Sequence, residues 1–222
     1  MKKNLLALAF LVGLLTCCKS EDAPIKPVKP TDPGSINKEY MSRAETTFAN
    51  IFKYYWSDKV RMMFGSYPNT LGTPQEPSSP DYDSHAYLWG LGSVVSAFNA
   101  IVQNTDNVDF RMTYESRLKE TLLKYYNTTK EPMCFGCFVN PHDQRLYDDA
   151  IWVGIDLADL YSKTKDSWYL DYAKSVWNFV LSGKDDELGG GVYWDENAKD
   201  SKNTCSNAPA VVLALKLYQI TN

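Results

Sequence analysis

Apolar residues recur at helical spacing along most of the chain, and no convincing pair of alternating strands is present. The spacing predicts helices over residues 36–56, 84–104, 111–127, 146–163, 166–182 and 206–220. The first, third and fifth of these have one apolar and one polar face; in 166–182, for example, Leu170, Ala173 and Trp177 share a face. We expect these amphipathic segments to be outer helices.

The second, fourth and sixth predicted helices are apolar nearly all round, as in AIWVGIDLADLY, so we expect them to be inner helices covered on every side. Trp89 and Trp152 hold comparable places 63 residues apart, and Ala210 follows 58 residues later. This spacing predicts an internal repeat of outer–inner hairpins. Periodicity leaves open whether such hairpins stack as an open solenoid or close into a ring.

The N-terminal end has the pattern of an export signal. Lys2 and Lys3 precede the apolar run 5–15, which is too short to span a bilayer as a mature helix. The run ends in LLTCCKSED, which resembles a bacterial lipoprotein cleavage box with a leucine three residues before either cysteine. Cys17 or Cys18 is therefore the predicted lipidation site. The alternative is an ordinary secretory signal that carries cysteines by chance.

Glu21 and Asp22 resemble the surface-export signals of Bacteroidetes lipoproteins, which predicts an outer-membrane lipoprotein exposed on the cell surface. Proline then recurs at every third position, at Pro24, Pro27, Pro30 and Pro33. This period favours an extended polyproline tether. The chain divides into a signal peptide with lipobox (1–18), a tether (19–36) and a helical domain (37–222).

The composition narrows the class of partner. The 222 residues are 44% hydrophobic, enough for one sizeable core or part of a larger one. The net charge of −4 and the absence of a basic cluster argue against a nucleic-acid partner. The aromatic content of 14% suits helical packing, and it also suits stacking against sugar rings.

Polar residues gather before the inner helices, in DYDSH, LYDD and NTCSNAP. Gly189 to Gly191 lack the lysine and hydroxyl residue of a phosphate loop, so we expect the loop that contains them, residues 183–205, to be a rim loop over the end of the inner helices. Polar groups at one end of apolar helices predict a cleft there.

Two segments, LYDDAIWVGIDLADLY and GGGVYWDENAKDSKNTCSNAPAVVLALKLY, resemble glycoside hydrolase family 76, which includes endo-α-1,6-mannanases. The resemblance covers the chain from about residue 40 onward. It implies an all-α fold built as an (α/α)6 toroid, and thus favours the closed ring. Only three of six hairpins are present, so we expect an N-terminal half whose inner helices lack partners on the side of the missing C-terminal half.

Asp148 and Asp149 begin the fourth predicted helix. A helix N-terminus keeps one carboxylate ionised, and that charge raises the pKa of its neighbour, which yields the acid and base that glycosidic cleavage needs. Adjacent carboxyls can reach the roughly 5 Å separation of retaining enzymes, and the longer inverting separation stays open. The resemblance implies Asp148 as nucleophile, Asp149 as acid/base, retention of configuration, α-mannan as substrate and no metal or cofactor. The alternative is an N-capping pair without chemistry.

Further residues are candidates for sugar binding. Aromatic side chains that could stack on mannose are Trp89, Tyr147, Trp152, Tyr193 and Trp194. Asn203 and Asn207 could bond hydroxyl groups, and His85 could contact substrate or pack in the core. Asp156 and Asp159 lie farther down the helix and are expected to pair within the wall.

The CFGC motif, Cys134 to Cys137, has the spacing of half a zinc site, with His142 and Cys205 as conceivable partners. The export signal favours a disulfide over zinc, and no βαβ pattern supports a thioredoxin role. Two rival functions remain: a surface glycan-binding lipoprotein, and a sugar epimerase, for which two histidines leave little room.

Overall fold

The structure is a computed structural model that describes residues 33–68, 85–139 and 144–222. It divides into two units, Met1–Lys38 and Glu39–Asn222, and the second unit holds the helical domain. The predicted signal, most of the tether, Cys17 and Cys18 lie outside the described residues, as does His142, so these remain predictions. Among the described residues, no helix has the length and hydrophobicity of a membrane span.

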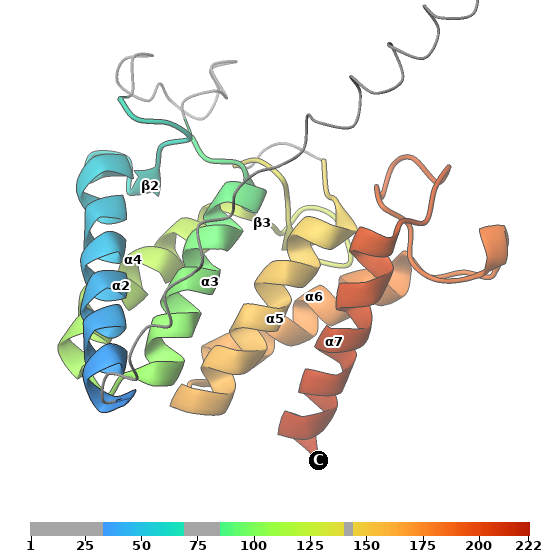
Figure 1. Ribbon diagram of the computed structural model, residues 1–222. Coiled ribbons are helices and arrows are strands. Elements are labelled where there is room, and N and C mark those ends of the chain that lie inside the picture. Colours follow the sequence, from blue (N-terminus) through green and yellow to red (C-terminus); the bar gives the residue numbers. More distant parts are fainter. Residues whose placement is uncertain (1–32, 69–84, 140–143) are drawn as a thin grey trace, which may run out of the picture. The chain divides into compact units, whose positions relative to one another are not determined.

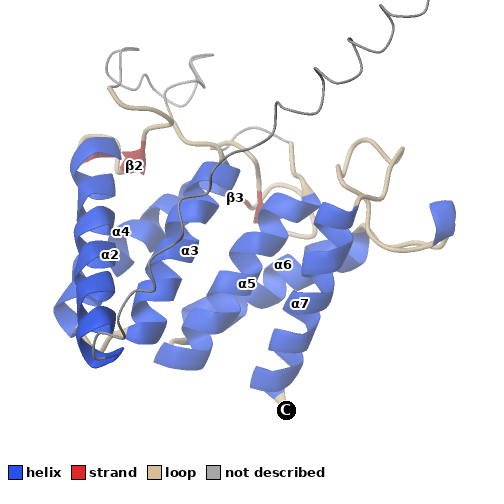
Figure 2. Ribbon diagram, in the orientation of Figure 1, coloured by secondary structure: helices blue, strands red, loops and turns tan. Residues whose placement is uncertain are grey.

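All six predicted helices are present, with ends that differ by a few residues (Figure 2). They are α2 (Pro33–Tyr55), α3 (Leu88–Asn104), α4 (Val108–Tyr125), α5 (Tyr147–Thr164), α6 (Ser167–Ser182) and α7 (Thr204–Thr221). α4 begins earlier than predicted because the Asn107 side chain caps it, accepting from the Phe110 amide at 3.1 Å. Asp166 caps α6 in the same way through the Trp168 amide, at 3.0 Å.

Two short antiparallel ladders accompany the helices. β1 (Trp56–Ser57) pairs with β2 (Met62–Met63), and β3 (Tyr126–Asn127) pairs with β4 (Cys134–Phe135). The second ladder ends α4 at Tyr125, before the predicted residue 127. Each strand is two residues long, too short to leave an alternating pattern in the sequence.

α3, α5 and α7 lie side by side as the inner row, with α4 and α6 behind them (Figure 1). α5 is the central element, because it packs against α3, α6 and α7. Gly154 allows this close approach: a Cβ there would lie 2.9 Å from Val176 of α6 and 3.1 Å from Leu213 of α7.

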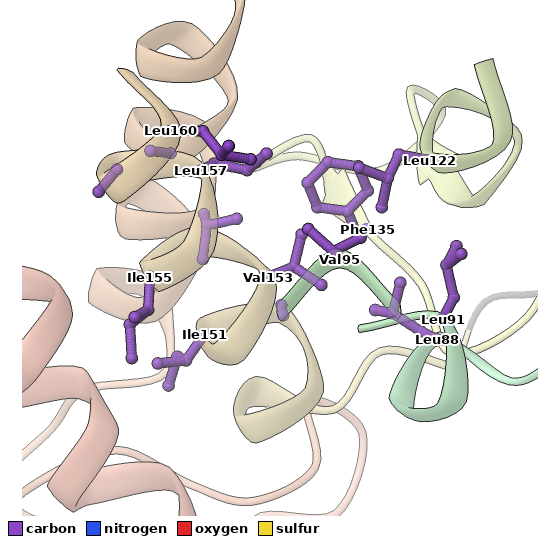
Figure 3. Close-up of a cluster of buried hydrophobic side chains, with 14 of the residues drawn as sticks. Leu88, Leu91, Val95, Leu122, Phe135, Ile151, Val153, Ile155, Leu157 and Leu160 are labelled. Atoms are coloured by element: carbon purple, nitrogen blue, oxygen red, sulfur yellow. The ribbon is translucent and has the colours of Figure 1, made fainter. Parts of the chain in front are cut away.

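The core is continuous across the hairpins. Val153 of α5 lies beside Val95 of α3, and Phe135 of β4 beside Leu122 of α4 (Figure 3). α2 joins through Phe48, whose ring is 6.1 Å from that of Phe98 in α3. Phe48 is 1% exposed, so the outer helix is anchored by a fully buried aromatic ring.

A polar network that is buried at Asp156 and partly exposed at Asp159 joins the three inner helices, and both residues pair within the wall as predicted. Asp156 accepts hydrogen bonds from Ser96 and, at 2.8 Å, from Asn99, both of α3. Asp159 forms an ion pair with Lys216 of α7. The two carboxylates therefore connect helices within the wall.

The described residues leave α7 uncovered on one side, which agrees with the expectation of inner helices that lack partners. Val211, Leu215 and Tyr218 are 60%, 57% and 66% exposed. They follow one another at helical spacing and form the α7 stripe. α5 and α6 cover only the opposite side of α7, and no described element packs on the stripe.

Gly154→Ala is expected to lower the free energy of unfolding by about 1–3 kcal/mol, because the new methyl group overpacks the contact between α5, α6 and α7. Gly90→Ala in α3 is the matched control, since its Cβ would meet only Ala86, at 3.7 Å. That change should be neutral or stabilising. Urea unfolding measures both, and equal effects of the two variants would contradict this account of the helix packing.

Candidate active site

Asp148 and Asp149 are the second and third residues of α5, and each is only 8% exposed. The N-cap position is Leu146, which makes no side-chain cap hydrogen bond. The acidic pair therefore does not occupy the capping position that the alternative interpretation required. Both carboxylates lie at the N-terminal end of α5, which is the positive end of the helix dipole.

Arg145 fixes the segment that leads into α5. Its guanidinium is fully buried, forms a bidentate ion pair with Glu196, and donates to the carbonyl oxygens of Lys130 and Pro132 at 3.1 and 2.7 Å. Burial alone would raise the pKa of Glu196, but hydrogen bonds from Arg145 and Lys130 outweigh it and hold that pKa below its usual value. Arg145 thus ties two loops to the start of the helix.

The backbone around Arg145 pairs with the rim loop and brings a tryptophan to the acidic pair. The Glu196 amide donates to the Arg145 carbonyl at 3.2 Å, and the Tyr147 amide donates to the Trp194 carbonyl at 2.9 Å. The Trp194 indole N–H then donates to Oδ2 of Asp148 at 3.3 Å. Asp148 Oδ1 is buried without a hydrogen-bond partner among the described residues.

The backbone conformation of the rim loop requires its three consecutive glycines. Gly189, Gly190 and Gly191 have φ angles of +86°, +88° and +87°, where side chains are strained. A Cβ on Gly191 would also lie 2.4 Å from Asn207 Oδ1. The Asn207 amide is itself occupied, because it accepts from the Val192 amide at 2.8 Å and donates to the Val192 carbonyl at 2.9 Å.

Asp149 lines a cavity of about 320 Å³ between α3 and α5. Trp89 and Trp152 line the same cavity and are 56% and 43% exposed. Large indole faces held open to solvent beside a carboxyl group are the surfaces on which sugar rings stack. The cavity continues to Ser96, at the top of the polar network in the wall.

The pKa of Asp149 is raised to about 6, first by burial and second by the negative charge of Asp148. Asp149 therefore holds a proton under mildly acidic conditions. A protonated carboxyl beside a second carboxylate is the arrangement that glycosidic cleavage uses.

The structure corrects three of the sugar-binding expectations. Tyr147 is 1% exposed and stacks on Phe179 with centroids 4.3 Å apart, and the Gly183 backbone covers its ring edge. Tyr193 is 3% exposed under Lys202, which lies 4.5 Å from its ring. The side-chain amide of Asn207 is hydrogen-bonded to Val192 of the rim loop. These side chains build the rim, and none of them offers a free surface to a sugar.

The other candidates remain accessible to varying degrees. Trp194 is 37% exposed, and Asn203 is partly exposed at the N-cap of α7, where its side chain makes no cap hydrogen bond. His85 and Trp89 both line a second cavity, of about 310 Å³. Burial, followed by the nearby charge of Lys124, lowers the pKa of His85.

The cysteines do not assemble a metal site in the part of the chain described here. Cys134, Cys137 and Cys205 are free thiols, and no group of three or more metal-ligating side chains is present among the described residues. Cys134 and Cys137 are buried, whereas Cys205 is exposed.

The sequence profile of glycosyl hydrolase family 76 matches residues 39–222. The chain therefore belongs to this family, and its helices are those of the helical toroid that the family resemblance implied. Among curated protein sequences, none matches the chain.

Solved structures of family members are similar over most of the domain. A family 76 glycoside hydrolase from a bovine Bacteroides thetaiotaomicron strain is 30% identical, with a TM-score of 0.68, and the match covers 82% of this chain and 38% of that one. A family 76 mannosidase from Bacteroides thetaiotaomicron is 25% identical, with a TM-score of 0.69, over 82% and 49%. This chain therefore spans less than half the length of either relative.

A more distant member, the α-1,6-mannanase of a Salegentibacter species, is 22% identical, with a TM-score of 0.60, over 83% of this chain and 46% of that one. A variant of that enzyme with two adjacent aspartates replaced by alanine is described as inactive, and it is in complex with α-1,6-mannotetraose.

Sequence reasoning missed Arg145 and Glu196. Arg145 directly precedes the LYDD segment and Glu196 follows Trp194 by two residues, but nothing in the sequence links two residues 51 positions apart. The only available signal was a lone arginine before a buried helix.

Asp149→Asn is expected to raise the free energy of unfolding by roughly 2–3 kcal/mol at pH 8. The pKa of Asp149 is raised from 3.8 to about 6 on folding, so native Asp149 loses stability as pH rises through that window, whereas asparagine does not. The gain should therefore vanish below pH 4. Urea unfolding across this pH range measures it, with exposed Asp171→Asn in α6 as control; a gain independent of pH would contradict the assignment.

Proposed function

We propose that the protein hydrolyses α-1,6-mannosidic linkages in mannan with retention of configuration. The observation that carries this proposal is the raised pKa of Asp149, beside Asp148, in a cavity lined by two exposed tryptophans. Family membership supplies the reaction class, and the inactive double-aspartate variant of the Salegentibacter mannanase supports the same chemistry.

In this mechanism Asp149 begins as the acid. It donates its proton to the glycosidic oxygen as the bond to the anomeric carbon breaks, and Asp148 attacks that carbon to form a covalent glycosyl ester. Asp149, now ionised, removes a proton from water, which attacks the same carbon and releases Asp148 as a carboxylate. Two inversions give net retention, and the starting protonation states are restored.

The surroundings of each carboxylate fit these roles. Asp148 keeps Oδ1 without a partner among the described residues, while the Trp194 indole orients Oδ2. Trp89 and Trp152 would stack on mannose rings next to Asp149. Neither step uses a metal ion or an organic cofactor.

We also propose that the full catalytic unit contains further hairpins that cover the α7 stripe. The chain spans 38% and 49% of the relatives' lengths, and Val211, Leu215 and Tyr218 form an apolar face without a described partner. Leaving such a face in water costs free energy in proportion to the apolar surface that stays exposed.

The 222-residue chain alone is accordingly expected to bind a hydrophobic fluorescent dye, and Leu215→Lys should reduce that binding while leaving the melting temperature nearly unchanged. Met112→Lys, at a 68% exposed position on outer helix α4, is the control and should not alter the signal. A dye-silent native chain would show that the stripe does not behave as an uncovered interface.

Asp148→Ala and Asp149→Ala are each expected to lower kcat on linear α-1,6-mannan by on the order of 10³-fold in the complete gene product, because each removes one partner of the acid–nucleophile pair. Native turnover should fall as pH rises above about 6, when Asp149 loses its proton.

Asp156→Asn is the matched control for this experiment, since Asp156 is buried on the same helix but bonds within the wall. It should lower the melting temperature and leave kcat within about tenfold of native. Loss of turnover in Asp156→Asn with full turnover in Asp148→Ala would refute the assignment. Mannan binding without hydrolysis by the native protein would favour a glycan-binding lipoprotein.

A further inference from the structure

The second cavity at the start of α3, which we call the Ser66 cavity, adjoins the cavity that Asp149 lines, because Trp89 is a wall of both. The two volumes are about 310 and 320 Å³. Sites that bind small molecules enclose about 300–1,000 Å³, so each cavity has the size for a small ring. Gly65 and Ser66, which follow β2, form one side of the Ser66 cavity, and residues around the start of α3 form the other. The proposed mechanism uses only the Asp149 cavity.

Two aromatic rings of the Ser66 cavity are open to solvent. Tyr87, at the N-cap position of α3, is 47% exposed, and Trp89, two residues later, is 56% exposed. The Tyr87 ring packs against Phe138, with centroids 5.0 Å apart and ring planes at 78°, which fixes its orientation without covering it. Exposed rings that are held in place are the surfaces on which the apolar faces of sugars stack.

The backbone holds the segment with these two rings in position. The Ala86 amide donates to the Met63 carbonyl of β2 at 3.0 Å. The Leu88 amide donates to the Cys137 carbonyl at 2.9 Å. The segment is therefore bonded to β2 on one side and to the CFGC segment on the other. A binding surface that is ordered before the ligand arrives loses little free energy to ordering.

The rest of the lining favours an uncharged ligand. Among the described residues that line the Ser66 cavity, none is an aspartate, glutamate, lysine or arginine. Burial, followed by the nearby charge of Lys124, lowers the pKa of His85, so this lining residue is uncharged at neutral pH. Gly65 and Gly90 leave space between the rings, and the Ser66 hydroxyl can donate and accept hydrogen bonds. A neutral ring with an apolar face and hydroxyl groups fits this lining, whereas a charged group would find no opposite charge.

From this arrangement we propose that the Ser66 cavity is a second sugar-binding subsite, which holds a further unit of the same α-1,6-linked mannan chain that occupies the Asp149 cavity. The chain crosses Trp89, and the unit beyond it stacks on Tyr87. This inference rests on the proposed function, in which the Asp149 cavity holds the bond that is cleaved. Tyr87 and Ser66 accordingly help to set the chain length that the protein binds best.

The test is the affinity of linear α-1,6-manno-oligosaccharides, from the disaccharide to the hexasaccharide, for complete gene product that carries Asp149→Asn. Calorimetry then measures binding apart from turnover. Affinity should rise at the chain length that first reaches the Ser66 cavity. Tyr87→Ala should remove that rise and lower the affinity for the hexasaccharide by roughly three- to tenfold, because one stacking surface is lost. Tyr40→Ala, at a 64% exposed position on outer helix α2, is the matched control and should keep the rise.

Gly90→Leu tests the same cavity by filling it instead of removing a wall. A Cβ on Gly90 would meet only Ala86, at 3.7 Å, so α3 has room for a side chain that extends into the cavity. This variant should also remove the rise in affinity with chain length. Its melting temperature should equal or exceed that of the native protein, because leucine favours the helix more than glycine does.

Native affinity for the hexasaccharide in both Tyr87→Ala and Gly90→Leu would overturn the inference, as would an equal loss of affinity for the disaccharide and the hexasaccharide. A loss confined to oligosaccharides with an α-1,2-linked mannose branch would show that the cavity holds a side branch, and the proposed chain path would be wrong. Hydrolysis is measured separately, in protein with native Asp149. If the variants lose the rise but this protein does not cleave mannan, the subsite stands and the proposed function fails.

Discussion

Two adjacent carboxylates are held almost out of water at the first turn of α5, and this desolvation governs the rest of the site. Asp148 and Asp149 are each 8% exposed, so their mutual repulsion is screened poorly by solvent. Burial and the charge of Asp148 raise the pKa of Asp149 to about 6, so Asp149 keeps a proton below that pH. In the proposed mechanism, burial thus prepares Asp149 to act as the acid before any substrate is bound.

Holding this arrangement requires a rigid frame around the acidic pair. α5 supplies it by packing against α3, α6 and α7, with Gly154 at the close approach of α6 and α7. Its carboxylates Asp156 and Asp159 also bond to α3 and α7. At the upper end, the fully buried Arg145 ties the rim loop to the helix start, and that loop delivers the Trp194 indole to Asp148. The helix packing in the wall stabilises α5, and the rim loop orients the Asp148 carboxylate through Trp194.

The sequence predicted much of this because helical periodicity and the acidic pair are local signals. The helices, the inner row and the wall positions of Asp156 and Asp159 all follow from spacing along one segment. The failures concern contacts between distant segments. Tyr147 resembles a sugar-stacking residue in sequence, yet the backbone of Gly183 and the ring of Phe179 close over it. Likewise, nothing local reveals that Arg145 pairs with Glu196.

The central claim is that Asp148 and Asp149 perform a double displacement, and the configuration of the first product tests it most directly. Time-resolved proton NMR of linear α-1,6-mannan with the complete gene product should show the α-anomer of the new reducing end appearing first, followed by slow mutarotation. Initial release of the β-anomer would require direct attack by water, and it would contradict a nucleophilic Asp148.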